Sequence, residues 1–387
     1  MRPLRIAMIG QRGVPATFGG IEHHVEELGS RLAARGHEVI VYCRTNYADQ
    51  RRTTYRGMRL VHLPTVSRKH LDAIVHSTLA TLDAVRRGAD VVHYHAVGPG
   101  IPAALPRYLS RARVVLTVHG LDAERAKWGR GARAVLRVAQ WLSARVPDAT
   151  VVVSQDLQHH YRLRYRRRTW YIPNGIEEPI RRPPRLITER FGLRGDDFLL
   201  FVGRLVPEKA PHLLLRVFRD LPTDRRLVIA GGSSFTDDYV RRLEAEAGDD
   251  PRVLMPGYVY GEVLAELYAN ASAFVLPSSL EGLPLTLLEA AAYGTPVVVS
   301  DIPPHLEVVG GDGPGHRVFR SGQPTDLRRA IERVLEGGPE ERRGAEELRR
   351  RVLGTYRWDA AAEATESLYR SLLEGSPPAQ GSFARSC

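Results

Sequence analysis

The chain has 387 residues and a formal net charge of +11, with 43% hydrophobic and 26% charged residues. That length predicts two sizeable domains, and that balance is typical of globular proteins, which excludes a disordered or fibrous chain. Two cysteines, Cys43 and Cys387, are too few for a disulfide framework or a cysteine-rich zinc site. No run of about 18 apolar residues occurs, so no transmembrane helix is predicted.

The N-terminal apolar stretch is short and runs into a glycine-rich turn, which favours a first strand over a signal peptide, so a cytoplasmic location is expected. The positive charge suits nucleic acid, an anionic membrane or a phosphorylated substrate. No nucleic-acid-binding motif is present, so nucleic acid is not expected as a partner. Only three basic residues are lysines, Lys69, Lys127 and Lys209, and each is a candidate for a place that needs a compact ammonium group.

Strands alternate with helices along the first half of the chain. A strand is predicted over 5–9, a loop over 10–20 and a helix over 21–35, whose apolar residues recur at helical spacing. Further strands are predicted over 38–42, 91–94, 114–118 and 150–153, and a helix over 133–145.

The turn Pro173-Asn174-Gly175 precedes a basic, proline-containing segment that is interpreted as a linker. The alternation then resumes, with strands predicted over 198–202, 227–230, 253–255, 273–276 and 296–299 and a last helix over 358–373. We therefore predict an α/β protein with two facing, doubly wound Rossmann-like domains, 1–178 and 185–355, and an active site between them. The tail, 374–387, is expected to be disordered.

Three loops between a strand and a helix carry candidate chemistry. In the first, Gly19 and Gly20 would let the backbone approach a ligand closely, and the following helix N-terminus would attract an anion. The loop matches neither the dinucleotide fingerprint nor a Walker loop. An ordinary turn between strand and helix remains an alternative.

In the second loop, Arg204 and Lys209 lie five residues apart and would suit a diphosphate, although a salt-bridged surface loop is also compatible. In the third, Glu281 precedes a helix that starts near Pro284, and Glu289 lies inside that helix. The carboxylates would accept hydrogen bonds from sugar hydroxyls, and the backbone N–H groups of Gly282 and Leu283 would meet a phosphate. A glutamate near a helix N-terminus can also simply offset the helix dipole.

Together these motifs resemble the retaining glycosyltransferases of family 4, which have the two-domain GT-B fold with a deep cleft between the domains. Glu281 and Glu289 match the E-x7-E motif of that family, and Gly203-Arg204 with Lys209 match its Gly-Arg loop. The similarity covers about residues 4–373. The start of the chain, from Gly10 to Glu22, is similar to a bacterial subgroup that builds polysaccharides and includes rhamnosyltransferases.

The resemblance implies a role for each matching residue. Arg204 and Lys209 would neutralise the donor diphosphate, Glu289 would bind the ribose and Glu281 would contact the donor sugar. His119 would face the sugar from the first domain, and Tyr258 lies where the family often holds the base. The helix at 356–373 would pack back on the first domain.

The implied reaction moves a sugar from a nucleoside-diphosphate sugar to a carbohydrate or lipid-linked hydroxyl, with the anomeric configuration retained. No D-x-D motif is present, so no metal or other cofactor is expected, and the leaving diphosphate would be stabilised by Arg204, Lys209 and a helix N-terminus. Because no carboxylate is identifiable as a nucleophile, front-face attack is favoured, with the leaving phosphate oxygen taking the acceptor proton. The residues do not distinguish rhamnose, mannose, glucose and N-acetylglucosamine.

Two other functions are compatible with parts of the pattern. A nucleotide-sugar 2-epimerase has a similar fold but lacks the glutamate pair, and a non-catalytic anion-binding protein would not require both glutamates and both cations. The stretch from Arg133 to Val146 is amphipathic and basic, which predicts either an ordinary domain helix or one that rests on an anionic membrane near a lipid-linked acceptor.

Overall fold

The computed structural model describes residues 2–17, 19–66, 72–124, 129–233, 236–248 and 250–375. These residues divide into two compact units: unit 1 takes in the described residues up to 124, then 129–175 and 358–375, and unit 2 takes in those of 176–357. Phe18, Lys69, Lys127 and the predicted disordered tail from residue 376 onward lie outside the described residues.

Unit 1 contains an eight-stranded sheet with the strand order β3-β4-β2-β1-β5-β6-β7-β8, in which every pairing is parallel except that of β3 with β4. Its strands are β1 (Arg5–Ile9), β2 (Glu38–Arg44), β3 (Thr54–Tyr55), β4 (Met58–Leu63), β5 (Val91–His95), β6 (Arg113–Val118), β7 (Ala149–Val152) and β8 (Trp170–Tyr171). The central strands are apolar and buried, as expected for a parallel sheet that is covered on both faces.

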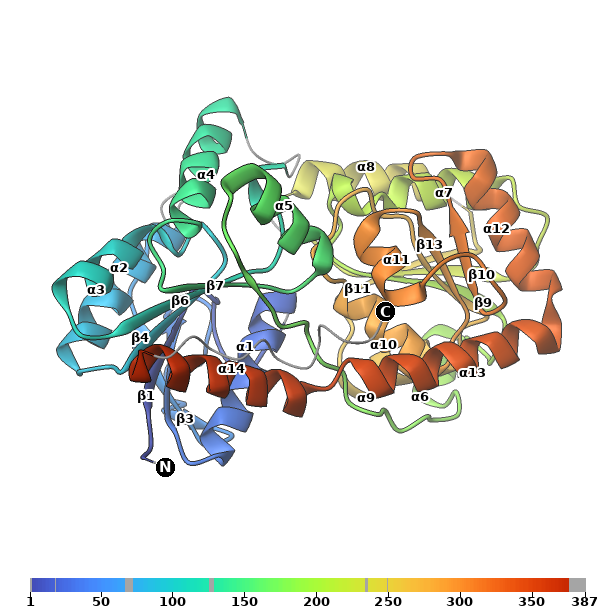
Figure 1. Ribbon diagram of the computed structural model, residues 1–387. Coiled ribbons are helices and arrows are strands. Elements are labelled where there is room, and N and C mark those ends of the chain that lie inside the picture. The colour runs from blue at the N-terminus through green and yellow to red at the C-terminus, as the bar shows by residue number, and fades with distance from the viewer. Residues whose placement is uncertain are drawn as a thin grey trace. The chain divides into compact units, whose positions relative to one another are not determined.

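The helices of unit 1 connect these strands, and the last one comes from the far end of the chain. They are α1 (Gly20–Ala34), α2 (Asp72–Arg86), η1 (Ile101–Ala103), α3 (Ala104–Leu109), η2 (Asp122–Glu124), α4 (Arg130–Ser143), α5 (Gln155–Tyr165) and α14 (Trp358–Glu374). Helix α14 lies along α1 (Figure 1), and Arg31 Nε on α1 is 2.9 Å from Asp359 Oδ1 on α14. The hydroxyl of Tyr369 lies 2.6 Å from His93 Nδ1, so α14 also contacts the sheet.

Unit 2 contains a six-stranded parallel sheet with the order β11-β10-β9-β12-β13-β14. Its strands are β9 (Phe198–Val202), β10 (Arg226–Ala230), β11 (Val253–Gly257), β12 (Ala273–Leu276), β13 (Val297–Ser300) and β14 (His316–Phe319). Its helices are α6 (Leu186–Phe191), η3 (Pro207–Lys209), α7 (Pro211–Arg219), α8 (Asp237–Ala247), α9 (Gly261–Asn270), α10 (Leu285–Tyr293), α11 (Pro303–Val309), α12 (Pro324–Glu336) and α13 (Gly338–Thr355). Helices from both sides bury the apolar strands β9, β12 and β13.

The strand order reverses once in each sheet, beside the first strand of the unit. In unit 1 the reversal lies between β1 and β5, and in unit 2 it lies between β9 and β12. Ligands of open α/β sheets bind at such reversals, outside the carboxyl ends of the strands. The topology therefore directs attention to the loops after β1, β5, β9 and β12.

The predicted pair of doubly wound sheets is confirmed. The predicted helices and strands are present with ends that move by one or a few residues, as with α1, which begins at Gly20, and α4, which runs from Arg130 to Ser143. Four strands were not predicted: β3, β4, β8 and β14. Within the described ranges, none of the helices combines the length and the apolar character needed to cross a bilayer.

Candidate active site

The loops after β9 and β12 meet at the strand-order reversal of unit 2. The backbone N–H of Ser279 in the second loop donates to the carbonyl of Glu208 in the first, over 2.8 Å. Gly203 at the end of β9 lets the stem of Lys209 pass, because a Cβ at Gly203 would lie 3.0 Å from Lys209 Cδ. This backbone hydrogen bond holds the two loops against each other, and the stem of Lys209 packs on Gly203.

A buried ion pair joins these loops. Lys209 Nζ donates to Glu281 Oε1 over 2.6 Å, and only 11% and 12% of the two side chains are exposed. Ser278 Oγ donates to the same carboxylate oxygen over 2.8 Å. Burial raises the pKa of Glu281, but the Lys209 ammonium, His305 and the hydrogen bond from Ser278 together outweigh it, and the pKa lies below its usual value. Glu281 is therefore held as a carboxylate.

His305 of α11 lies behind the ion pair. Its Nδ1 is 3.1 Å from the carbonyl of Ser300, and the Ser300 hydroxyl donates to the carbonyl of Ser278. Burial lowers the pKa of His305 to about 4, against the raising effect of the nearby Glu281 carboxylate. A neutral imidazole therefore supports the loop that carries Glu281.

Glu289, one turn inside α10, is positioned by a tyrosine pair. Its Oε2 accepts a 2.8 Å hydrogen bond from the hydroxyl of Tyr268 on α9. The ring of Tyr293 stacks on that of Tyr268 with the centroids 5.6 Å apart and an interplanar angle of 13°. Burial and the Glu289 carboxylate both raise the pKa of Tyr268, so the hydroxyl stays protonated and donates. One carboxylate oxygen of Glu289 is thereby fixed in position.

Helix α10 follows the Glu281 loop directly, with Pro284 before its first residue. The N–H groups of a first helical turn have no acceptor within the helix, and they favour an anion. Gly282 and Leu283 are buried just before this turn. An anion would therefore be favoured at the start of α10, close in sequence to Glu281.

Arg204 and Tyr258 lie in the loops after β9 and β11. Arg204 is half-buried and follows Gly203. The hydroxyl of Tyr258 donates to the carbonyl of Ser233 over 2.9 Å, and the Tyr258 ring lies so close to Gly232 that a Cβ there would be 2.4 Å from it. Tyr260 stacks on Tyr258 with a centroid distance of 6.1 Å. Two aromatic rings thus lie beside the loop that follows β10.

In unit 1, the fold of the loop after β1 itself requires a glycine at position 19. Gly19 has a φ of 108°, and a Cβ there would lie 2.2 Å from Glu22 Oε2. The other oxygen of Glu22 accepts from the backbone N–H of Arg12 over 3.0 Å. Gly19 is therefore needed for Glu22 to fold back on the loop, whereas Gly20 is exposed.

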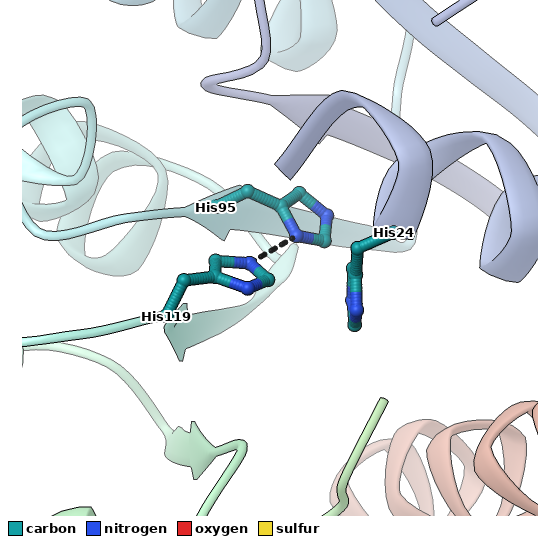
Figure 2. A group of neighbouring side chains, drawn as sticks. All are labelled: His24, His95 and His119. Atoms are coloured by element: carbon teal, nitrogen blue, oxygen red, sulfur yellow. Dashed lines mark hydrogen bonds between the residues drawn. The ribbon is translucent and has the colours of Figure 1, made fainter. Parts of the chain in front are cut away.

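His119, directly after β6, belongs to a group of three histidines (Figure 2). Its Nε2 lies 3.4 Å from Nδ1 of His95, the last residue of β5, and its ring centroid lies 4.6 Å from that of His24 on α1. Burial lowers the pKa of His24 to about 4 and that of His95 well below its usual value. The group lies where α1 begins and where β5 and β6 end.

Two family models match the chain, one for each unit. The model described as Glycosyltransferase Family 4 matches residues 18–178, and the model described as Glycosyl transferases group 1 matches residues 187–351. The chain belongs to glycosyltransferase family 4.

The glycosyltransferase has relatives over nearly its full length. It is 25% identical to an uncharacterised glycosyltransferase of Methanocaldococcus jannaschii, over 96% of this chain and 99% of the relative. It is 29% identical to glycogen synthase of Mycobacterium tuberculosis, over 96% of each chain. The expected enzyme class, glycosyl transfer, is confirmed.

Solved structures confirm the predicted GT-B fold. Sucrose-phosphate synthase from Thermosynechococcus elongatus superposes with a TM-score of 0.84 at 24% identity, covering 96% of this chain and 99% of that one. HepE of Anabaena, solved with UDP and glucose, gives a TM-score of 0.78 at 18% identity, over 95% and 100% of the two chains.

Within unit 2 of this glycosyltransferase, the structure brings together Lys209 and Glu281 and places the Gly282–Leu283 backbone beside them. Sequence reasoning missed Tyr268 and His305, because their contacts join separate helices and loops, and it gave no role to Ser278, which contacts Glu281 within the same loop. It also missed His24 and His95 as neighbours of His119. The pattern His93-x-His95 at the end of a strand, followed by His119 at the end of the next, was the available signal.

Proposed function

We propose that this glycosyltransferase moves a sugar from a nucleoside-diphosphate sugar to an acceptor hydroxyl with retention of the anomeric configuration and without a metal cofactor. The observation that carries the proposal is the buried Lys209–Glu281 pair at the strand-order reversal of unit 2, directly before the N-terminus of α10. The comparisons support the donor class, since the Anabaena relative was solved with UDP-glucose and starch synthase IV of Arabidopsis with ADP.

In this proposal, different residues of unit 2 bind different parts of the donor. Lys209 has three donors, so it can bind a phosphate oxygen while it keeps its bond to Glu281. Arg204 would add a second cation, and the N–H groups of Gly282 and Leu283 would meet the same diphosphate. Glu289, held by Tyr268, would bind the ribose hydroxyls. Tyr258 would lie beside the base, and Gly19 and Gly20 of unit 1 would admit the donor to the loop after β1.

The chemistry follows from a carboxylate that is already paired. Glu281 is committed to Lys209 and Ser278, so it suits hydrogen bonding to sugar hydroxyls better than nucleophilic attack. In the proposed front-face reaction, the bond from the anomeric carbon to the phosphate oxygen breaks and the acceptor oxygen bonds to the same carbon. The acceptor proton passes to the departing phosphate oxygen. Lys209 and Arg204 stabilise the charge that develops there, and His119 would hydrogen bond to the sugar.

The exposed apolar residues of helix α4 and the basic pocket beside it favour a lipid-linked acceptor. Val135, Val138 and Trp141 are each at least half exposed on this helix. A pocket of about 560 Å³ beside it is lined by residues of η2, α4, α5 and the segment after α4: Ala123, Glu124, Arg133, Arg137, Gln140, Trp141, Arg145, His160, Arg164 and Tyr165. Four arginines around an indole ring suit the phosphate of an anionic lipid.

We therefore propose that the enzyme works at the inner face of a bacterial plasma membrane, in the synthesis of a cell-surface polysaccharide or glycoconjugate, as the rhamnosyltransferase-like start of the chain suggests. Flotation with vesicles that contain an anionic lipid tests this contact. We expect binding at low salt that Arg137→Glu/Trp141→Ser weakens, with Arg328→Glu/Tyr260→Ser in unit 2 as the matched control. Equal binding of both variants, or none by the native chain, would exclude the contact.

A thermal-shift screen with UDP, GDP, dTDP and ADP, each with and without EDTA, tests the donor site. We expect one nucleotide to raise the melting temperature by mass action, equally with and without EDTA. Incubating the matching nucleotide sugar without an acceptor then separates this function from its alternatives. Isomerised sugar would indicate a 2-epimerase, and binding without transfer to any supplied acceptor would indicate a non-catalytic protein.

A further inference from the structure

Three histidines of unit 1 form an arrangement that the proposed sugar transfer does not require. His24 comes from the start of α1, His95 ends β5 and His119 follows β6, the neighbouring strand (Figure 2). One ring nitrogen of each lies within 4.8 Å of the others. We propose that these three imidazoles bind a divalent transition-metal ion, with Zn²⁺ as the best fit, and that the bound ion inhibits the enzyme.

The spacing of the nitrogens fits zinc. Imidazole nitrogens bind Zn²⁺ at roughly 2.0–2.1 Å in tetrahedral geometry, which places two of them roughly 3.4 Å apart. Nδ1 of His95 and Nε2 of His119 lie 3.4 Å apart, joined by a long hydrogen bond that a bound ion would replace (Figure 2). The His24 nitrogen lies within 4.8 Å of the other two, so small shifts of the His95 and His119 side chains would bring all three around one ion while Asn174 holds His24. Three protein ligands would leave a fourth position for water.

The orientation of His24 supports the same conclusion. Its Nδ1 lies 2.8 Å from Oδ1 of Asn174, and because an amide oxygen only accepts, Nδ1 carries the hydrogen. Nε2 is then a lone pair, buried and without a hydrogen-bond partner among the residues that the structure describes. Metal-binding histidines characteristically donate their second nitrogen to an oxygen in this way, which fixes the tautomer and the ring.

The surroundings exclude the hard cations. The edge of Trp358 packs against His24 with a centroid distance of 5.6 Å, and the His93 ring lies 4.2 Å from that of His95. Imidazole ligands suit Zn²⁺, Cu²⁺ and Ni²⁺, whereas Mg²⁺ and Ca²⁺ need oxygen ligands. Bound zinc would occupy the His119 nitrogen that is proposed to face the sugar. The ion is therefore expected to inhibit transfer, which is compatible with metal-free chemistry in unit 2.

Titration of the full, tag-free chain with Co²⁺ tests the site directly, with activity as a separate readout. We expect one Co²⁺ per chain with the intense visible bands of tetrahedral coordination, displaced by Zn²⁺ and unaffected by excess Mg²⁺. His24→Gln and His95→Gln should each abolish these bands, while His159→Gln, which changes an exposed histidine of α5, should retain them. Melting curves check that each variant is folded.

Substitutions of Asn174, which orients His24, should change the metal affinity without removing a ligand. Asn174→Ala should weaken binding by about 10- to 100-fold, the usual effect of losing such a partner, and Asn174→Asp should restore it. X-ray absorption at the zinc edge of the native protein should show three imidazole nitrogens, which needs no variant. Absence of stoichiometric Co²⁺ binding, bands that survive both ligand substitutions, or a different ligand set would overturn the proposal. Because these readouts record binding, they are independent of whether the proposed transfer is correct.

Discussion

Substituting Lys209 by methionine should uncouple the two loops of unit 2. The side chain keeps its length but loses its charge, which leaves the Glu281 carboxylate buried without its cation. At the 2.6 Å separation of the pair and an effective dielectric constant of about 20, the Coulomb attraction is about 6 kcal/mol, and desolvation of both groups offsets part of it. Removing one partner of a buried pair typically costs about 3–5 kcal/mol, and we expect Lys209→Met to destabilise unit 2 by that amount.

Urea unfolding of a double-mutant cycle measures this effect. Glu281→Gln should cost a similar amount, since it leaves the Lys209 ammonium unpaired. The double variant Lys209→Met/Glu281→Gln should be about as stable as either single variant, which corresponds to a coupling of about 3–5 kcal/mol. The pair Arg320–Asp326, whose arginine side chain is 75% exposed, is the control, and its coupling should be much weaker because solvent screens it.

The same variants report on catalysis. If Lys209 stabilises the leaving diphosphate, Lys209→Met should lower kcat by about 10²- to 10³-fold under conditions where the variant remains folded. Additive stabilities in the cycle would refute the buried pair as an energetic unit, and near-normal turnover would refute the assigned role of Lys209.

Three further predictions concern the residues behind the site. Tyr268→Phe removes the donor to Glu289, so the KM for the nucleotide sugar should rise about tenfold or more with kcat nearly unchanged; Tyr239→Phe is a control that should leave the KM unchanged. The pKa of His305 is about 4 in the folded chain and 6.5 in the unfolded chain, so the unfolded chain binds the proton first as the pH is lowered. The free energy of unfolding is therefore highest above pH 6.5. It falls by about 1.4 kcal/mol per pH unit between pH 6.5 and about pH 4. His305→Gln should reduce the slope of unfolding free energy against pH by one proton, and an unchanged slope would contradict this. Gly231→Ala places a Cβ 1.8 Å from the carbonyl oxygen of Gly203, at a φ of 151°. The control is Gly257→Ala, whose Cβ meets open space and which adds only backbone strain of about 1–3 kcal/mol. Gly231→Ala should therefore lower the melting temperature far more than Gly257→Ala.

The sequence was informative where the signal is local. The strands β1, β9 and β12 are short apolar runs that end in glycine- or proline-containing loops, so both the alternation and the loops at Gly203 and Glu281 were predictable. The edge strands β3, β8 and β14 were missed because they are short, partly exposed and mixed in polarity, and their pairing depends on the neighbouring strand.

The contacts that orient the site were beyond the reach of a single sequence. Tyr268 and Glu289 lie 21 residues apart on two helices, and His24 and Asn174 lie 150 residues apart. Neither pair shares a periodic pattern, because each arises only after the sheets have formed. The residue types of the site were therefore predictable, whereas their hydrogen-bond partners were not.

The discontinuity of unit 1 has a consequence for synthesis on the ribosome. Among the described residues, unit 2 is one continuous segment, 176–357, and can fold as soon as it has emerged, whereas unit 1 lacks its last helix until α14 has been translated. Until then α14 does not cover two parts of unit 1. One is the face of α1 whose Arg31 pairs with Asp359, and the other is the imidazole of His93, which contacts Tyr369. Nascent chains are thus exposed to aggregation for the time taken to make unit 2, and shortening the chain before residue 358 makes that state permanent.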